Sequence, residues 1–480
     1  MFTVMKQATT LTYTGFILIF ISLGTGLNAQ SAVTGQLSFN DVLRLVKAYH
    51  PLMQQARLQP EFAAAEWLKA KGGFDPSLSG NVSQKYYDGK DYYSLFSGEL
   101  KIPTAIGADV KTGFEQNRGS FLGPENATPT GGLYYAGISM PLGQGLIIDE
   151  RRAALRSADI MKGFASARQK EMANEILYDA GMKYWDWFRA FHIRQIYLSS
   201  LQNARERFNA IKTNVTIGER PAIDTTEAKI QIQNILLGLN LAELDYKNTS
   251  ILFSGLFWDE SGTPAGLPDN LIPIEAKAEL ENNTTAVLPI DKSDFAAIHP
   301  YLEQLRQKTA QLEVDKNLKK DKLKPKINLQ YNPLTESVGG NIFANYNINN
   351  YKWGMEFKMP LFLRKERGDI RLADLKIKET DMLLRHKTTE LYNKYNTYIS
   401  EWKATQEQIS IYTETVKMYE QMYNAEKRQF NIGESSLFLV NAREQAYINA
   451  KIKLTELIAK NRLAFYTIYF YAGQLEDVIE

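Results

Sequence analysis

Two stretches of the sequence are too long and too free of proline to be helices of a compact globular domain. They cover residues 151–249 and 371–464, and one short glycine-containing turn interrupts each of them. No proline stands between Leu146 and Ile217, a run of roughly 70 residues that would form a helix about 100 Å long. The sequence therefore predicts two long antiparallel helical hairpins.

Apolar residues in the second stretch follow steps of four and three. They are Leu391, Tyr395, Tyr398, Trp402, Ile409, Tyr412, Val416, Tyr419, Tyr423 and Phe430, with breaks at Thr405 and Glu426. A repeat of about 3.5 residues sustained this long is typical of a left-handed coiled coil, because a straight helix would drift off the seam. We interpret these aromatic side chains as packing positions and not as a binding site.

Residues 1–29 predict a cleavable export signal. Lys6 gives a positive start, residues 16–23 form a short apolar core, and Leu27-Asn28-Ala29 provides a cleavage site. No later stretch approaches the roughly 20 apolar residues that a membrane helix needs. The chain contains no cysteine, so neither disulfides nor a lipid-bearing cysteine are expected. A formal net charge of +2 gives no reason to expect a nucleic-acid partner.

The chain also repeats itself once. The aligned anchors are His50-Pro51 with His299-Pro300 and Pro76 with Pro325 at a shift of 249, Pro141 with Pro360 at a shift of 219, and Gly218 with Gly433 at a shift of 215. Anchors in the same order predict two tandem structural repeats, at residues 30–256 and 293–480. A proline- and glycine-rich linker, with at most a short helix, joins them at residues 257–292.

The repeats differ mainly between their paired prolines. The interval from Pro76 to Pro141 is nearly twice as long as the interval from Pro325 to Pro360. From the second proline of each pair to the tip glycine, by contrast, the two intervals are almost equal. We therefore expect rods of nearly equal length and loops of unequal length.

Between the paired prolines the pattern changes to strict alternation of apolar and polar residues. It is clearest at residues 106–115 and 352–359 and predicts two strands in each repeat, four in the chain. Aromatic residues crowd these segments: Tyr86, Tyr87, Tyr92, Tyr93, Tyr134, Tyr135, Tyr351 and Trp353. In addition, residues 117–132 have the composition of a long external loop. In an exported chain these features favour a membrane β-barrel. The alternative is an ordinary half-buried sheet of a soluble protein.

Four strands cannot close a barrel. In lipid, an open sheet edge would leave backbone groups unpaired at several kcal/mol each. Other copies of the chain must then complete the sheet, and three copies would supply twelve strands.

The order of strand pair, Pro-Leu, long rod, glycine turn and returning rod, all repeated, resembles the TolC-like outer membrane efflux protein family, the outer membrane factors. The likeness covers Leu37 to Gly473, with "MPLFLRKERGDIRLA" similar to the family's passage from barrel to rod and "IGERPAIDTTEA" similar to its periplasmic turn. It implies an α+β membrane protein, a homotrimer with a twelve-stranded transmembrane β-barrel in outer membrane lipid above a tunnel of coiled-coil helices. It further implies an exit duct for efflux or type I secretion, which meets a periplasmic adaptor protein and an inner-membrane transporter.

Two groups of residues are candidates for special roles. Pro76, Pro141, Pro325 and Pro360 are predicted at strand–helix junctions, because proline can continue neither hydrogen-bond ladder. The candidate functional residues are those of the tip turns, where the family meets its adaptor and constricts its tunnel: Gly218, Glu219, Arg220, Asp224, Gly433, Glu434 and Ser435. Both glycines are also expected to end a helix with positive φ.

The tip turns depart from the family pattern. Asp224 matches an acidic position of the first turn, but Asp224-Thr225-Thr226-Glu227 also reads as a helix N-cap with its capping box. In the second turn, Leu439 stands where the family has aspartate and Ser435 where it has arginine. The family's acidic ring and Asp–Arg latch therefore cannot be carried over unchanged. We hypothesise instead that Arg220 pairs with Glu219 or Glu434 of a neighbouring copy.

The remaining features predict no chemistry. The four histidines are not at metal-binding spacing, and there is no nucleophile motif or phosphate loop, so we expect no enzyme, cofactor or metal. Lysines between residues 316 and 326 are either a solvated helix end or a ring near anionic headgroups. The competing function is an exported coiled-coil scaffold, which would be found in the soluble periplasmic fraction, whereas a barrel would require detergent and migrate as an oligomer.

Overall fold

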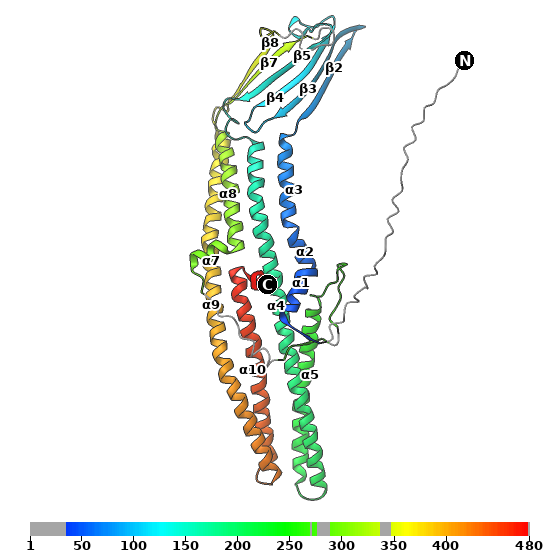
Figure 1. The fold of residues 1–480 in the computed structure, drawn as a ribbon, viewed down its shortest axis with the longest axis vertical. Helices are drawn as coiled ribbons and strands as arrows, with labels where there is room; N and C mark the ends of the chain where they lie inside the picture. The colour runs from blue at the N-terminus through cyan, green and yellow to red at the C-terminus, as the bar shows by residue number, and fades with distance from the viewer. Residues whose placement is uncertain (1–34, 269–270, 276–288, 337–346, 479–480) are drawn as a thin grey trace, which may run out of the picture.

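The computed structural model describes residues 35–268, 271–275, 289–336 and 347–478, so the predicted export signal lies outside the described residues. The molecule is elongated, with a curved β-sheet at one end and helices running from it to the other (Figure 1). The helices are α1 (Phe39–Tyr49), α2 (Pro51–Arg57), α3 (Gln59–Lys71), α4 (Glu150–Thr216), α5 (Ala222–Ser254), α7 (Lys292–Ile298), α8 (Pro300–Asp321), α9 (Arg364–Asn431), α10 (Leu437–Ala472) and α11 (Leu475–Val478). The strands are β1 (Gln36–Leu37), β2 (Ser77–Tyr87), β3 (Lys90–Pro103), β4 (Asp109–Arg118), β5 (Leu133–Pro141), β6 (Ile272–Pro273), β7 (Lys326–Thr335) and β8 (Tyr351–Lys358).

Both repeats contain a helix, strands, a very long helix, a turn and a returning helix, which confirms the α+β class and the two predicted hairpins. The long helices α4 and α9 have 67 and 68 residues, a length of about 100 Å each. The returning helices α5 and α10 are about half as long, with 33 and 36 residues. Within the described residues, no helix combines the length and the apolar composition needed to cross a lipid bilayer.

The helices form a layer four helices wide at both levels of the molecule. In the half away from the sheet the order is α5, α4, α10 and α9, and in the half near the sheet it is α3, α4, α8 and α9. The long helices α4 and α9 run through both levels. One edge of the layer is therefore formed by α3 and α5, and the other edge by α9.

The aromatic stripe of α9 packs against the returning helix α10, as predicted. Trp402, Tyr423 and Phe430 are all buried. Thr405, one of the two breaks, is buried as well, and its Oγ1 accepts a hydrogen bond of 2.8 Å from Asn461 Nδ2. A hydroxyl fits this seam because it is hydrogen-bonded there.

The largest core lies halfway along the rods. The rings of Trp187 in α4 and Phe253 in α5 stack with centroids 4.7 Å apart, and the Tyr184 hydroxyl donates a 3.0 Å hydrogen bond to the carbonyl of Leu37. Leu37 belongs to strand β1, which pairs in parallel with β6. The described part of the inter-repeat linker therefore lies against the middle of the rods.

The main sheet has six antiparallel strands in the order β2-β3-β4-β5-β7-β8. The prediction of four strands per chain is wrong in number, because the first repeat contributes four and the second two. Residues 106–108, predicted to open a strand, belong to the turn before β4. The unequal spacing of the paired prolines thus reflects two additional strands, and not loop length alone.

The sheet has two chemically different faces. Residues that are directly paired across strands share a face. One face is mainly apolar in all six strands: Leu78, Val82, Phe96, Leu100, Ile102, Val110, Phe114, Tyr134, Ile138, Met140, Ile327, Leu329, Tyr331, Trp353, Met355 and Phe357. The other is mainly polar: Ser79, Asn81, Lys85, Glu99, Lys101, Asp109, Lys111, Glu115, Ser139, Asn328, Gln330, Asn332, Lys352, Glu356 and Lys358. The described helices lie beyond the end of the sheet and cover neither face (Figure 1).

The four junction prolines lie where strands and helices meet. Pro76 and Pro325 directly precede β2 and β7. Pro141 is the last residue of β5, and Pro360 stands shortly after the end of β8. At the ends of strands, the amide hydrogen that proline lacks is not needed to continue the hydrogen bonds of the sheet.

Candidate functional site at the helical tips

The two tips farthest from the sheet have the same backbone geometry. Gly218 and Gly433 have φ angles of 82° and 84°. The amides of Glu219 and Glu434 each donate a 2.9 Å hydrogen bond to the carbonyl five residues earlier. This is the Schellman arrangement, which requires a residue with positive φ at the glycine position.

The helices that follow the turns begin differently. Helix α5 starts at Ala222 behind Pro221, so Asp224 lies within its first turn and the prediction of Asp224 as N-cap is wrong. The fixed φ of proline favours a helix start directly after it. Helix α10 is capped by Ser436, whose hydroxyl accepts a 3.4 Å hydrogen bond from the amide of Leu439.

Arg220 connects the first tip with the second. Its Nη2 donates a 2.7 Å hydrogen bond to the carbonyl of Phe430, and its guanidinium carbon lies 3.7 Å from the centroid of the Phe430 ring. Its Nη1 lies 3.5 Å from Asp224 Oδ2. Phe430 is near the C-terminal end of α9, where the helix dipole favours a positive charge. The hypothesis that Arg220 pairs with Glu219 or Glu434 of another copy stays a prediction.

About three turns above the tip, a buried polar triad joins α4, α9 and α10. Arg207 Nη1 donates hydrogen bonds to Tyr423 OH at 3.1 Å and to Glu444 Oε1 at 3.2 Å, and Tyr423 OH donates to the same carboxylate oxygen at 3.1 Å. The side chains of Arg207 and Glu444 are only 9% and 3% exposed. The triad therefore fastens the first hairpin to both helices of the second.

At neutral pH, Arg207 stays protonated and Tyr423 stays neutral. Burial lowers the pKa of Arg207, but the hydrogen bonds and the charge of Glu444 outweigh it, so the net pKa is raised. Burial, helped by the charge of Glu444, raises the pKa of Tyr423 to about 12. The heptad pattern predicted Tyr423 as a packing position only and did not indicate its polar partners.

Three further polar contacts lie between the tip and the triad. The Ser435 hydroxyl donates to Glu426, and Arg443 Nε lies 3.7 Å from the same carboxylate. Asn441 Nδ2 donates to Glu227 Oε1 at 3.3 Å, which joins α10 to α5. Of these three contacts, only the one between Asn441 and Glu227 joins the two hairpins.

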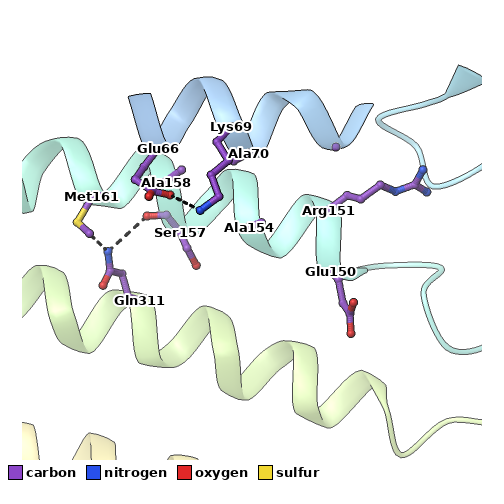
Figure 2. Close-up of a pocket in the computed structure, with 11 residues that line it drawn as sticks. Glu66, Lys69, Ala70, Glu150, Arg151, Ala154, Ser157, Ala158, Met161 and Gln311 are labelled. Atoms are coloured by element: carbon purple, nitrogen blue, oxygen red, sulfur yellow. Dashed lines mark hydrogen bonds and ion pairs between the residues drawn. The ribbon is translucent and has the colours of Figure 1, made fainter. Parts of the chain in front are cut away.

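A groove near the sheet offers no comparable site. It lies between α3, α4 and α8 and is floored by small residues of α4 (Figure 2). Its polar groups are already paired, Lys69 with Glu66 at 3.4 Å and the Gln311 amide with the Ser157 carbonyl at 3.5 Å. Throughout the described part of the chain, no group of three or more residues could hold a metal ion.

Comparison with known proteins agrees with this architecture. Residues 293–474 match the family described as outer membrane efflux protein, whereas no curated protein matches the sequence. Solved structures with the same fold include the Campylobacter jejuni CmeC outer membrane channel, 14% identical, covering 91% of this chain and 86% of that chain with a TM-score of 0.63. The outer-membrane channel OprN is 14% identical, with coverages of 91% and 90% and a TM-score of 0.66.

The open state of the Neisseria gonorrhoeae MtrE outer membrane channel is also similar, at 11% identity, coverages of 91% and 89% and a TM-score of 0.65. At identities this low, the structural similarity establishes a shared fold alone. The family match covers the second repeat. The second repeat therefore matches the outer membrane efflux protein family, and nearly the whole length of the chain has the fold of these channels.

Proposed function

We propose that three copies of this chain form the outer membrane exit duct of a tripartite efflux or type I secretion system. The observation that carries this proposal is the sheet, which is apolar on one face across all six strands and polar on the other. Leu78, Trp353 and Phe357 of the apolar face are 83%, 62% and 64% exposed. A soluble scaffold would have to bury such a surface, whereas a transmembrane barrel exposes it to lipid and lines its interior with polar groups.

The edges of the helical layer support assembly from several copies. Along α5, exposed apolar residues recur every seven positions: Ile223, Ile230, Leu237, Leu244 and Ile251. Along the lower part of α9, Ile411 and Met418 follow the same spacing, and the exposed Ile432 stands two repeats further on, beyond the helix end. Stripes with a seven-residue repeat are seams for coiled-coil partners. We therefore propose that α5 of one copy packs against α9 of the next.

Three copies would place twelve helices around a tunnel, as the family resemblance implies. Rods of about 100 Å, hanging from a barrel in the outer membrane, would cross most of the periplasm. The polar lining of the barrel would conduct water and solutes with coarse selectivity.

The far end of the rods would meet a periplasmic adaptor protein and, through it, an inner-membrane transporter. Glu219 and Glu434 are exposed at the turns, next to the exposed apolar side chains of Ile217, Ile432 and Phe438. Apolar side chains rimmed by charge are typical of protein interaction sites. Which transporter and which cargo are involved depends on that adaptor.

Extraction and conductance test this proposal. The mature protein should sediment with outer membranes, require detergent, migrate as a trimer and form ion-conducting channels in planar bilayers. A water-soluble monomer without conductance would contradict it. Glu219→Cys or Glu434→Cys should crosslink the adaptor, and no native cysteine competes with the introduced one.

A further inference from the structure

The first repeat contains one β-hairpin more than the second. Strand β2 follows α3 as β7 follows α8, and β5 leads into α4 as β8 leads into α9. The strands without a counterpart are β3 and β4. Without residues 88–118, the interval from Pro76 to Pro141 would nearly equal the interval from Pro325 to Pro360. The difference in length between the repeats is therefore this one hairpin.

The additional hairpin is a full part of the sheet. Strand β3 pairs with β2 from Lys90 to Lys101, and β4 pairs with both β3 and β5. Phe96 and Phe114 continue the apolar face, while Glu99 and Lys111 lie on the polar face, 3.7 Å apart. Both faces therefore run through the hairpin without a break.

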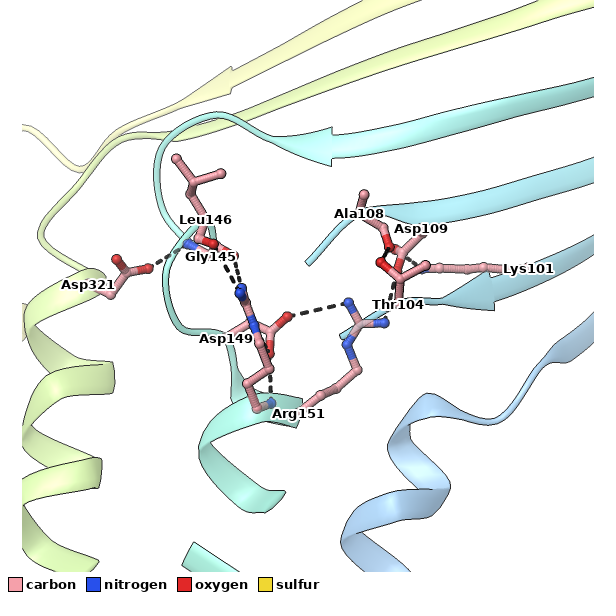
Figure 3. A network of polar contacts seen from close by, with 10 residues as sticks. Lys101, Thr104, Ala108, Asp109, Gly145, Leu146, Asp149, Arg151 and Asp321 are labelled. Carbon is pink, nitrogen blue, oxygen red and sulfur yellow. Dashed lines mark hydrogen bonds and ion pairs between the residues drawn. The ribbon is translucent and has the colours of Figure 1, made fainter. Parts of the chain in front are cut away.

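The base of this hairpin is fixed to the helices. Its turn, residues 104–108, closes through a 3.0 Å hydrogen bond from the Thr104 amide to the Ala108 carbonyl. The Asp109 carboxylate then lies 2.9 Å from both Lys101 Nζ and Arg151 Nη1, and Arg151 belongs to the first turn of α4 (Figure 3). These ion pairs hold the base of the hairpin against the first turn of α4.

We propose that the barrel closes with all six strands of each copy, β8 of one copy beside β2 of the next, which gives eighteen strands in the three-copy assembly. This inference rests on the proposed function. In the described part of the chain, β2 and β8 each pair with one strand only. Strand β2 runs away from the helices and β8 runs toward them, so their union is antiparallel. An even total in this range is usual for bacterial barrels.

The consequence is a membrane pore wider than twelve strands would give. Barrel diameter grows roughly linearly with strand number, so eighteen strands give about one and a half times the diameter of twelve. The helical tunnel below is still built from four helices per copy. The additional strands therefore widen the barrel without adding a helix to the tunnel.

Paired cysteines identify which strands meet between copies. Leu78, Val110 and Phe357 lie on the apolar face near the helical end of β2, β4 and β8. Phe357→Cys combined with Leu78→Cys should give disulfide-linked trimers in membranes. If only β4, β5, β7 and β8 formed the wall, Phe357→Cys would instead crosslink with Val110→Cys, and that result would overturn the proposal.

Neighbouring positions allow for a shift in register between copies. Gly80→Cys and Val82→Cys extend the β2 series, and Thr112→Cys and Phe114→Cys extend the β4 series. A membrane trimer in which no β2 cysteine crosslinks to β8 would also overturn the proposal. Ile138→Cys with Tyr331→Cys, paired within one chain, is the matched control and should give no intermolecular product.

Deletion of residues 88–118 provides an independent measurement. The shortened chain should still form membrane trimers, but electron microscopy should show a barrel narrower by about one third. An unchanged width would overturn the eighteen-strand assignment. If the full-length chain itself were a soluble monomer, the proposed function would fail first, so the two failures are distinguishable.

Discussion

The guanidinium carbon of Arg220 lies 3.7 Å from the ring centroid of Phe430, although the two residues belong to different hairpins. The same arginine donates a hydrogen bond to the Phe430 carbonyl and pairs with Asp224. One side chain thus joins a turn of the first repeat to the helix end of the second. If the hairpins separate when the duct opens, this contact must break.

Replacing Arg220 by alanine should loosen the tips. The lost cation–π contact and charge-assisted hydrogen bond are together worth about 1–2 kcal/mol. In planar bilayers, Arg220→Ala should raise single-channel conductance and shorten closed times. Arg205→Ala, at an exposed position of α4, is the matched control. Conductance and closed times equal to those of the unmodified protein would remove Arg220 from the gate.

The buried triad should matter more for stability than Arg220 does. Glu444→Leu leaves the buried guanidinium of Arg207 without its counter-charge, which should cost about 3–5 kcal/mol. Adding Arg207→Met should recover much of the loss, because no unpaired charge then remains. Thermal unfolding followed by circular dichroism measures both effects, with Glu407→Leu at an exposed position as the control. Equal losses in the single and double variants would argue against a coupled pair.

His299 should make the fold sensitive to mild acid. Its Nδ1 accepts a 3.2 Å hydrogen bond from the Tyr301 amide at the start of α8, and burial is the main reason that its pKa is lowered to about 4. The unfolded chain therefore binds a proton between pH 6.5 and 4 that the folded chain does not, so stability falls as the pH falls.

Between pH 7 and pH 5 the loss from this residue should be about 2 kcal/mol. Asparagine also caps helices but does not titrate, so His299→Asn should show a smaller drop in melting temperature over the same interval. The same drop in both proteins would show that other groups cause the acid sensitivity.

Replacing either tip glycine by alanine should destabilise the protein. Alanine at Gly218 or Gly433 would have to adopt a strongly positive φ, at a cost of about 1–2 kcal/mol. Gly368→Ala lies inside α9 with open space around the added methyl group, and should stabilise by about 0.5–1 kcal/mol. Melting temperatures that change in the same direction for Gly218→Ala and Gly368→Ala would contradict the role of the turn.

Local sequence was enough to predict the rods, the tip turns and the duplication, because proline spacing, heptads and glycine are local signals. The strand count was missed because glycine dilutes the alternation in β2 and β3. Gly80 and Gly98 face each other on the apolar face, between the pairs Leu78–Leu100 and Val82–Phe96. Two glycines remove the apolar signal but leave the backbone pairing intact.

The contacts of the tips could not be read from sequence because their partners are far apart. Arg220 and Phe430 are separated by 210 residues, and Arg207 and Glu444 by 237. The sequence did contain one signal of the buried triad. Glu444 stands midway between the buried residues Val440 and Ile448 at steps of four, so a charge occupies a position in the helical seam.

The two Schellman turns share a main chain but not their side chains. Arg220 follows Glu219 in one turn, and Ser435 follows Glu434 in the other. A threefold assembly would present six turns of equal shape, in which every second one carries a guanidinium. A partner that recognises main-chain shape would find sixfold equivalent positions there, whereas a partner that recognises the arginine would find only three.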